Sequence, residues 1–458
     1  MQRFDQTKYK EPMIQDMLSL VEIPSVIDEA EEGAPFGVEI QNALEKTLEI
    51  SKALGFRTFI DPEGYYGYAE IGEGEGLFGI LGHLDVVPAG DPEQWESPAF
   101  EPEVRDGKVY GRGTQDDKGP MIAAMYGAKQ LSDQGHKFSK RVRFIFGTDE
   151  ETLWRGIEKY MEKEEVPDFG FTPDSVFPII HGEKGLLQLY LRGQGSMDFE
   201  ISGGSSFNAL ADQAWVELKK SPGGEYKSRL KSLERVYNGL KKENHQVKME
   251  DHRLTLYGKS AHSAKPEGGL NAINLLAKHL KDAEFNHSAL NFIEEKLELS
   301  QYGEKLFGKM DDVSGPITIN AGQISIDKKA SEIALDIRIP VTVEKSLVEE
   351  KLQEAVKAYG LNITEHDFLE AIYLPKGHPL IQSLGEIYSK VTGEEALPLT
   401  SGGATYARAM PNCVAFGSVL PGRDKTEHQP NEHIILEDFM KVTTIYLNAI
   451  EKLTSGEG

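Results

Sequence analysis

The sequence predicts an α/β protein: a discontinuous domain, with a mixed, mostly parallel sheet flanked by helices, is interrupted by an inserted α+β domain. Strands and helices alternate over residues 1–185. The pattern becomes antiparallel-type over residues 186–374, and strand–helix alternation returns over residues 375–458. A chain of 458 residues also exceeds the length that one ordinary hydrophobic core supports, so more than one domain is expected.

The first part of the chain alternates amphipathic segments with continuously apolar ones. Apolar residues at helical spacing predict two helices, and Pro24 and Gly55 follow their last turns, as is typical of helix ends. The Gly-x-Gly-x-Gly of residues 71–77 precedes a strand rather than a helix, so it predicts a turn and not a nucleotide-binding loop. The predicted elements are helices at 13–21 and 43–54, a strand at 77–87, a helix at 120–131 with Pro120 as its first residue, and a strand at 141–146.

The rest of the chain mixes strands with helices. The lysine-rich residues 219–246 predict a helix between loops. The other predicted elements are strands from residue 186 onward, a strand at 253–258, a helix at 269–280, strands at 317–325 and 330–340, helices at 343–359 and 378–391, a strand at 413–418 and a helix at 436–453.

Composition excludes several classes of protein. The net charge is −24, from 50 basic and 74 acidic residues, and such a surface repels nucleic acid and anionic lipid. The single cysteine, Cys413, cannot form an intrachain disulfide, which fits a reducing compartment. No signal peptide is evident, and no apolar run approaches the roughly 18 residues of a membrane span. We therefore expect a cytoplasmic protein with no nucleic-acid or membrane partner.

Candidate ligands for a cation follow the predicted strands. GHLDVVP places His83 and Asp85 at a strand end, where residues two apart share a face, so Asp85 can orient the imidazole of His83. A simple hydrogen-bonded pair is the alternative. GRGTQDDKGP places Asp116 and Asp117 before a helix, where helix capping is the alternative to metal binding. GTDEET, at residues 147–152, places three carboxylates in a row, although adjacent like charges repel one another.

Two isolated residues complete the set. Asp174 lies in an apolar setting and His428 in a polar loop, where a turn aspartate and a surface histidine are the alternatives. Together with His83, Asp116 and the GTDEET acids they form a mixed nitrogen and oxygen ligand set that suits zinc or manganese. The set exceeds the usual three protein ligands of one catalytic zinc, so we expect a shared carboxylate to hold two ions about 3.5–4 Å apart.

In this order, GHLDVVP, GRGTQDDKG, GTDEET, Asp174 and His428 resemble the signature of the dizinc aminoacylase and carboxypeptidase G family of metallopeptidases. The resemblance covers nearly the whole chain and is closest to the bacterial PepV-type dipeptidases, whose insertion is long. It implies a catalytic domain formed by residues 1–185 and 375–458, and a lid domain formed by residues 186–374.

The resemblance also implies a role for each ligand. His83 and Asp174 would bind one divalent ion, Glu151 and His428 would bind the other, and Asp116 would bridge both. Zinc is the first expectation, with manganese and cobalt as alternatives.

The resemblance implies that Glu150 is the general base. This split of roles is physically reasonable, because neighbouring side chains diverge and one glutamate can bind a cation while the other faces a water molecule. Asp85 would assist catalysis by orienting His83, and Asp149 would cap the following helix. The bond between Asp116 and Asp117 would be cis.

The inserted region carries further marks of the family. GKSAHSAKPEGGLNA contains His262, which would polarise the substrate carbonyl. Arg338 lies inside an apolar strand and would bind the terminal carboxylate of the substrate, whereas pairing with Asp336 is the alternative. The other implied substrate-binding residues are Asn208, although SSFNALAD departs from the family's proline-containing phrase, and Gly402 and Gly403, which would let the backbone approach a ligand closely.

These features predict a metal-dependent dipeptidase whose partner is a small peptide with a free N-terminus. In many members of the family that the sequence resembles, a shorter lid forms the dimer surface and a partner supplies the histidine. The longer insertion here could take the place of that second lid, so we expect a monomer that supplies its own His262. One alternative is an N-acyl amino acid deacylase, such as an aminoacylase or a succinyl-diaminopimelate desuccinylase. Another is a binding protein without catalysis, against which Glu150 argues, because a binder needs metal ligands but no base.

Overall fold

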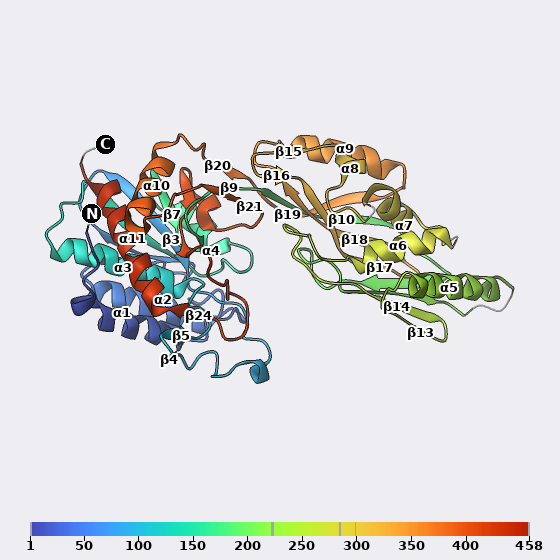
Figure 1. The fold of residues 1–458 in the computed structure, drawn as a ribbon, viewed down its shortest axis with the longest axis horizontal. Helices are drawn as coiled ribbons and strands as arrows, with labels where there is room; N and C mark the ends of the chain where they lie inside the picture. Colours follow the sequence, from blue (N-terminus) through green and yellow to red (C-terminus); the bar gives the residue numbers. More distant parts are fainter. Residues whose placement is uncertain (1, 221–223, 284, 298, 457–458) are drawn as a thin grey trace. The chain divides into compact units, whose positions relative to one another are not determined.

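The computed structural model describes residues 2–220, 224–283, 285–297 and 299–456 (Figure 1). The chain forms two compact units, each with its own hydrophobic core. The first unit comprises Met1–His181, Leu374–Leu399 and Thr405–Gly458, and the second comprises Gly182–Tyr373 and Thr400–Ala404. Residues 221–223, in a loop predicted beside the lysine-rich helix, lie outside the described residues.

A nine-stranded mixed sheet, most of whose strands lie in the first unit, forms the framework of that unit. Its order is β1-β2-β6-β3-β7-β22-β9-β20, with β21 also paired to β9. The pairs β6–β3, β3–β7 and β7–β22 are parallel, whereas the pairs toward both edges are antiparallel. The strands are β1 (Arg57–Ile60), β2 (Gly67–Ile71), β3 (Gly76–His83), β6 (Lys140–Gly147), β7 (Phe169–Thr172), β9 (Ile180–Glu183), β20 (Ile372–Tyr373), β21 (Leu399–Ser401) and β22 (Cys413–Ala415).

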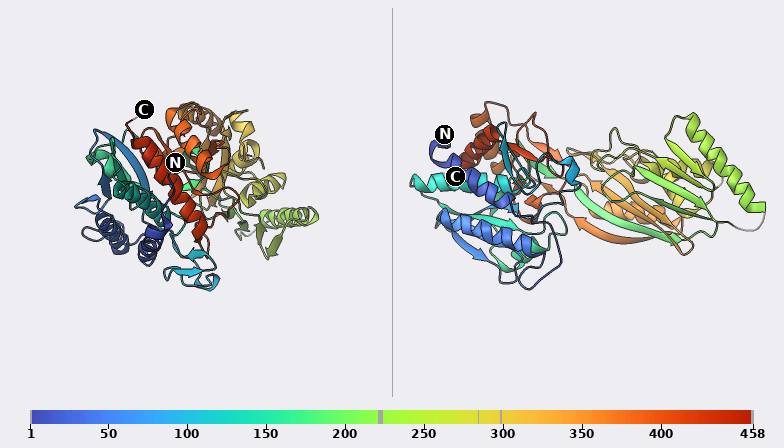
Figure 2. Two further views of the ribbon diagram at one scale, coloured as in Figure 1. Left: turned by 60° about the vertical axis from the view of Figure 1, so that its left-hand side comes forward. Right: turned by 90° about the horizontal axis from the view of Figure 1, so that it is seen from below.

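Helices pack against this sheet and bury their apolar stripes in its core. α3 and α11 lie side by side over β3 and β6, and α2 contacts β1 and β2 (Figures 1 and 2). The helices are α1 (Gln6–Val21), α2 (Val38–Ala53), α3 (Lys118–Asp133), α4 (Arg155–Lys163), α10 (Pro379–Thr392) and α11 (Leu436–Thr454). Smaller strands complete the unit: β4 (Glu103–Arg105), β5 (Lys108–Tyr110) and β24 (His433–Ile435) form one sheet, and β8 (Ser175–Val176) pairs with β23 (Ser418–Val419).

The second unit is built on an antiparallel eight-stranded sheet, in the order β13-β14-β12-β11-β17-β18-β10-β19. Its strands are β10 (Gly185–Gln194), β11 (Phe199–Gly203), β12 (Gln213–Leu218), β13 (Val247–Glu250), β14 (Arg253–Tyr257), β17 (Thr318–Ile326), β18 (Ala330–Ile339) and β19 (Asn362–Leu369), beside the short hairpin of β15 (Asp311–Asp312) and β16 (Gly315–Pro316). The helices are α5 (Gly224–Lys242), α6 (Ala272–Asp282), α7 (Ser288–Phe292), α8 (Glu304–Phe307) and α9 (Lys345–Lys357). Helices and sheet share one apolar core.

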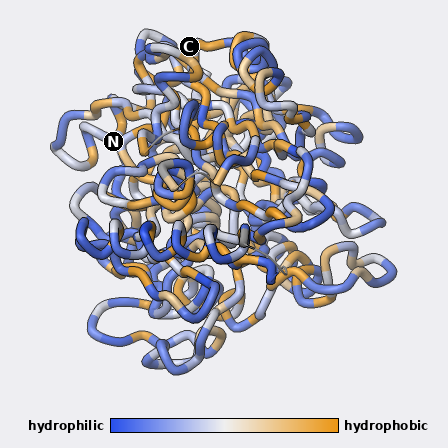
Figure 3. Tube along the Cα trace, turned by 90° about the vertical axis from the view of Figure 1, so that its right-hand side faces the viewer, coloured by the Kyte–Doolittle hydropathy of each residue, from blue (hydrophilic) through white to orange (hydrophobic). Residues whose placement is uncertain are grey.

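The distribution of hydropathy follows this architecture, because outer turns are mostly hydrophilic and apolar segments run through the interior (Figure 3). Within the part of the chain that the structure describes, no helix has both the length and the apolar character needed to cross a bilayer.

The structure confirms the predicted α/β class with a mixed sheet flanked by helices, and residues 72–75 form the predicted turn between β2 and β3. The sheet is mixed rather than mostly parallel, because three of its pairs are parallel whereas β1–β2, β2–β6, β22–β9 and β9–β20 are antiparallel. The prediction that Pro120 is the first residue of its helix is wrong, because α3 begins at Lys118 and Pro120 is its third residue. The first four N–H groups of a helix have no partner within it, so proline is tolerated throughout the first turn. The first helical residue, Lys118, is held in place by its buried ammonium, which donates to the carbonyls of Leu20 and Ile23 at 3.0 and 2.8 Å.

Candidate metal centre

Three parallel strands bring the predicted ligands to one edge of the larger sheet. β3 lies between β6 and β7, and the register pairs His83 with Gly147 and Ile80 with Phe171. The carboxyl ends of neighbouring parallel strands meet at one edge of a sheet. His83, the GTDEET segment after β6, and Asp174 after β7 therefore converge there.

The converging side chains form two groups that share one carboxylate. In the first group, His83 Nε2 lies 2.8 Å from Asp116 Oδ1 and 3.8 Å from Asp174 Oδ2. In the second, His428 Nε2 lies 3.2 Å from Asp116 Oδ2 and 2.9 Å from Glu151 Oε1. The two oxygens of Asp116 thus face different groups, which is the geometry expected of a carboxylate shared by two ions.

This donor set fits a pair of zinc-like ions. Each group offers one imidazole and two carboxylates, and one donor atom from each of its three residues lies within 4.8 Å of the others. Three protein ligands of these types per ion are usual for catalytic zinc. The peptide bond between Asp116 and Asp117 is cis, as the sequence resemblance implied.

Burial and mutual repulsion perturb the titration of this cluster. Burial raises the pKa of Asp174 to about 8, and the charge of Asp116 adds to the effect. Burial also raises the pKa of Glu151, again with Asp116 adding to it. Partial desolvation opposes protonation of His428, whose side chain is 52% exposed, but its hydrogen bonds with Asp116 and Glu151 raise the pKa to about 11. Such ligands bind cations in their deprotonated forms, so metal binding at this cluster displaces protons and weakens as the pH falls.

Asp85 connects the two groups, although not mainly through the contact that the strand pattern predicted. The Nδ1 atom of His83 lies 2.9 Å from the backbone carbonyl oxygen of Asp85 and 3.6 Å from carboxylate oxygen Oδ1. The other oxygen, Oδ2, accepts a hydrogen bond from the backbone N–H of Glu151 at 3.0 Å. Asp85 therefore contacts both the imidazole of His83 and the backbone of Glu151. The chain turns after β3, which brings the Asp85 side chain close to the segment that follows β6.

The three acids of GTDEET occupy different environments. Asp149 is buried and accepts hydrogen bonds from the backbone N–H of Arg155, the first residue of α4, at 3.0 Å and from its guanidinium at 2.7 and 3.1 Å, so the predicted capping role is confirmed. Glu150 is partly buried, and burial raises its pKa well above the ordinary value, opposed by His83 and reinforced by nearby acids. A carboxylate with a raised pKa beside a cation site is suited to accept and return a proton.

Sequence reasoning missed Glu432, which supports the loop carrying Asp116. It is fully buried, and its Oε2 accepts a hydrogen bond from Arg112 Nη1 at 2.7 Å. Its Oε1 accepts from the backbone N–H groups of Gly113, Gln115 and Asp116 at 3.0, 2.9 and 3.2 Å. A glutamate four residues after His428 was the available signal, but the sequence does not show that it is buried.

Replacing Glu432 by alanine is expected to lower the free energy of unfolding by about 3–5 kcal/mol, because Arg112 would stay buried without its carboxylate. Urea unfolding followed by fluorescence measures the change. The matched control is Glu427→Ala, which removes a more exposed pair with Lys425 in the same loop and should cost less than about 1 kcal/mol. Equal stability of the two variants would contradict the supporting role of Glu432.

The second unit gathers several residues that were predicted to bind substrate. His262 forms an isolated β-bridge with Ala209, and the N–H of Ser263 donates to the carbonyl of Asn208 at 2.8 Å. The exposed His262 ring accepts a hydrogen bond at Nδ1 from the N–H of Ala264 at 3.1 Å. The segments that contain Asn208 and His262 therefore lie side by side.

Arg338 pairs with Asp336, the contact predicted from the sequence as the alternative to binding the substrate carboxylate. Its buried guanidinium donates to both carboxylate oxygens of Asp336, at 2.8 and 3.0 Å, and to the carbonyl of Gly402 at 2.8 Å. Asp336 also accepts from Ser263 Oγ at 2.8 Å, which links Arg338 to the turn of His262.

The two glycines that follow Ser401 make contacts within the second unit. A Cβ atom on Gly402 would lie 2.7 Å from that of Ala264, so the close approach of this loop requires glycine there. The N–H of Gly403 donates to Ser401 Oγ at 3.0 Å.

Comparison with known proteins shows the family of the chain. The sequence profile of Peptidase family M20/M25/M40 matches residues 79–452. The chain is 34% identical over 461 residues to "Putative dipeptidase YtjP" of Bacillus subtilis (strain 168), with 97% of each protein covered.

Two solved structures share the fold. Human carnosine dipeptidase 1 matches with a TM-score of 0.61 and 16% identity, covering 97% of this chain and 96% of that one. The M20 family metallo-carboxypeptidase Sso-CP2 from Sulfolobus solfataricus matches with a TM-score of 0.59 and 18% identity, covering 96% and 98%.

The α/β fold, the ligand groups and these similarities define the class of protein as a metallopeptidase. The chain belongs to Peptidase family M20/M25/M40, which confirms the resemblance predicted from the motifs. The alternative of a binding protein without catalysis is thereby set aside.

Proposed function

We propose that this metallopeptidase is a dipeptidase that uses two divalent ions, zinc first, to hydrolyse dipeptides with a free N-terminus. The observation that carries the proposal is the sharing of Asp116 between two ligand groups, with Glu150 directly beside the ligand Glu151. The name of the Bacillus subtilis relative and the titles of the similar structures support peptides as the substrate class.

In this proposal, His83, Asp116 and Asp174 would hold one ion, and Asp116, Glu151 and His428 would hold the other. Bound ions of this kind polarise a carbonyl and lower the pKa of water to about 7. Glu150 accepts a proton from the attacking water and returns it to the leaving amine, which departs as a neutral group. Asp85 keeps the ring of His83 oriented throughout.

The second unit would act as a lid that binds the substrate. His262 is proposed to donate a hydrogen bond to the carbonyl oxygen as negative charge develops on it. Arg338, Asn208, Gly402 and Gly403 are proposed to hold the terminal carboxylate. Because Asp336 already occupies one edge of the Arg338 guanidinium, the substrate carboxylate would take the edge that faces away from Asp336.

The substrate class is tested by comparing alanyl-alanine with N-acetylalanine and N-succinyl-diaminopimelate at equal concentration. A dipeptidase should hydrolyse the dipeptide with a kcat/KM at least tenfold above that of both N-acyl compounds, because its site accepts a free amine. Preference for either N-acyl compound would favour the deacylase alternative and contradict the proposal.

We further propose that the enzyme acts as a cytoplasmic monomer whose own His262 serves its own site. Light scattering in solution should then give the mass of one chain, 50.9 kDa. A stable dimer across the working concentration range would contradict the monomer proposal without affecting the proposed chemistry.

A further inference from the structure

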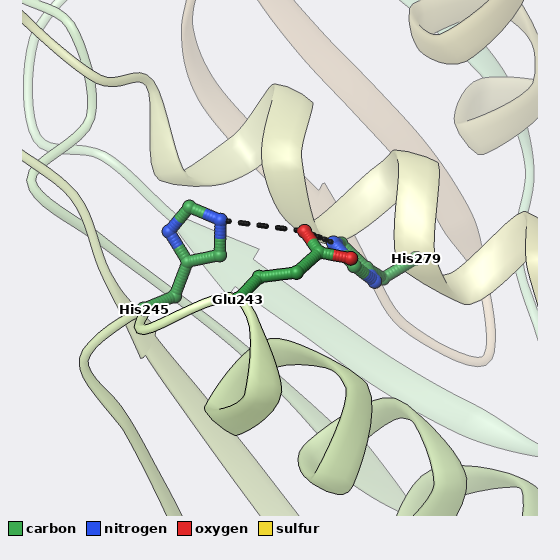
Figure 4. Close-up of side chains that lie close together, drawn as sticks. All are labelled: Glu243, His245 and His279. Carbon is green, nitrogen blue, oxygen red and sulfur yellow. Dashed lines mark ion pairs between the residues drawn. The ribbon is translucent and has the colours of Figure 1, made fainter.

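The second unit contains a separate cluster of one carboxylate and two imidazoles, which shares no residue with the ligand groups described above. Glu243 and His245 flank the turn after α5, and His279 lies in the last turn of α6 (Figure 4). The Oε2 atom of Glu243 lies 3.6 Å from His245 Nε2 and 3.4 Å from His279 Nε2. Both imidazoles thus face one carboxylate, and one donor atom from each residue lies within 4.8 Å of the others.

The backbone of the turn fixes two of these donors. Asn244 adopts a left-handed conformation with φ of 63°, and its N–H donates to the carbonyl of Lys241 at 3.1 Å. The N–H of His245 donates to the carbonyl of Leu240 at 3.0 Å. This pair of bonds is a Schellman motif, in which the left-handed residue and the residue after it donate to carbonyls of the last helical turn. Glu243 and His245 are therefore presented by a defined turn rather than by a mobile loop.

The third donor is held by packing. His279 is only 8% exposed, and its helix belongs to the apolar core of the unit. Glu243, with a side chain 52% exposed, and His245, with a side chain 23% exposed, leave the outer side of the cluster open to solvent. The cluster therefore combines a fixed inner ligand with an outer side from which a cation can enter, and the negative end of the α5 dipole favours a positive charge there.

The distances within this cluster are compatible with a bound ion. Separations of 3.4 and 3.6 Å are longer than the roughly 2.7–3.2 Å of an N–H···O hydrogen bond. Donors bound to zinc at about 2.0–2.1 Å in tetrahedral geometry lie roughly 3.3–3.4 Å apart. The 3.4 Å separation matches that spacing, the 3.6 Å separation is slightly longer, and the third pair of donor atoms lies within 4.8 Å.

We propose that Glu243, His245 and His279 form a separate binding site for a divalent transition ion that favours imidazole, with Zn²⁺ as the reference ion and Ni²⁺ and Cu²⁺ as chemical relatives. Two imidazoles and one carboxylate form an established zinc donor set, which leaves a fourth position for water. The bound ion cross-links the end of α5 to α6 and stabilises this part of the second unit. The proposal is independent of the dipeptidase assignment, since it shares no residue with the first centre.

The test measures zinc per chain in the full-length protein. The protein is stripped with a chelator, dialysed against a low fixed concentration of ZnCl₂ and analysed by elemental mass spectrometry. The wild type should retain one zinc ion per chain more than His245→Ala and one more than Glu243→Ala. Circular dichroism confirms that both variants, which alter partly exposed side chains, keep the fold.

The matched control is His252→Ala. His252 belongs to the same unit, its side chain is 22% exposed, and it lies 3.6 Å from Glu217, so it reproduces the His–Glu spacing of His245. It is not part of a group of three donors among the described residues. This control should retain the wild-type zinc content.

Equal zinc in the wild type and His245→Ala would overturn the proposal, as would an equal loss in His252→Ala. The measured quantity is a difference between chains that share the first centre unchanged. If the proposed dinuclear centre did not bind zinc, the wild type and all variants would lose the same amount of zinc. The difference in zinc content between the wild type and His245→Ala would therefore be unaffected.

Discussion

Glu150→Gln is expected to lower kcat for dipeptide hydrolysis by about 10²–10⁴-fold while both metal ions and substrate affinity are retained. Glutamine keeps the shape of the side chain but cannot accept a proton from the attacking water. Glu150 lies beside Glu151 without belonging to either candidate ligand group, so its replacement should not remove an ion. Steady-state kinetics and elemental analysis on the same preparation measure both quantities.

The neighbouring substitution Glu151→Gln is the matched control, because it makes the same chemical change one residue away. It removes a charged side chain that we propose as a ligand, in the group that contains His428, so it should lower metal content and activity together. Wild-type turnover in Glu150→Gln would refute the base. Loss of metal in Glu150→Gln with full metal in Glu151→Gln would show that the two roles are exchanged.

Asp116→Ala is expected to abolish tight binding of both ions and to reduce activity to background. Its two oxygens face different histidines, so one substitution removes a donor from both groups. It also leaves His83 and Asp174, and separately Glu151 and His428, as pairs that are each one ligand short of the usual three. Elemental analysis after dialysis should find less than half of the wild-type metal.

Two further substitutions serve as graded controls for Asp116→Ala. His83→Ala and His428→Ala each remove a ligand from one group only, so each should weaken one ion and spare the other. If Asp116→Ala lost no more metal than His428→Ala, Asp116 would not be shared between two ions.

Much of the first centre could be predicted from local sequence, because its ligands come directly after strands whose apolar runs are recognisable. His83 ends β3, the GTDEET acids follow β6, and Asp174 follows β7, so parallel neighbours bring them together. His428 lies in a loop far along the chain, and only the order of motifs in the resemblance singled it out.

The supporting contacts could not be predicted, because they depend on tertiary packing. Glu432 is a loop residue in a polar sequence, yet it is fully buried and accepts hydrogen bonds from four donors. The cluster of Glu243, His245 and His279 also escaped prediction, since His279 comes from a different helix. The sequence predicts the start of α3 two residues too late, because it does not show that the Lys118 side chain is buried and bonded within the fold.

The most direct test of the central claim is anomalous diffraction at the zinc absorption edge from a crystal of the zinc-loaded protein. Two anomalous peaks about 3.5–4 Å apart are expected on either side of the Asp116 carboxylate. One peak should contact His83 and Asp174, and the other Glu151 and His428. A single peak at this position, or a pair of peaks that Asp116 does not contact, would contradict the account.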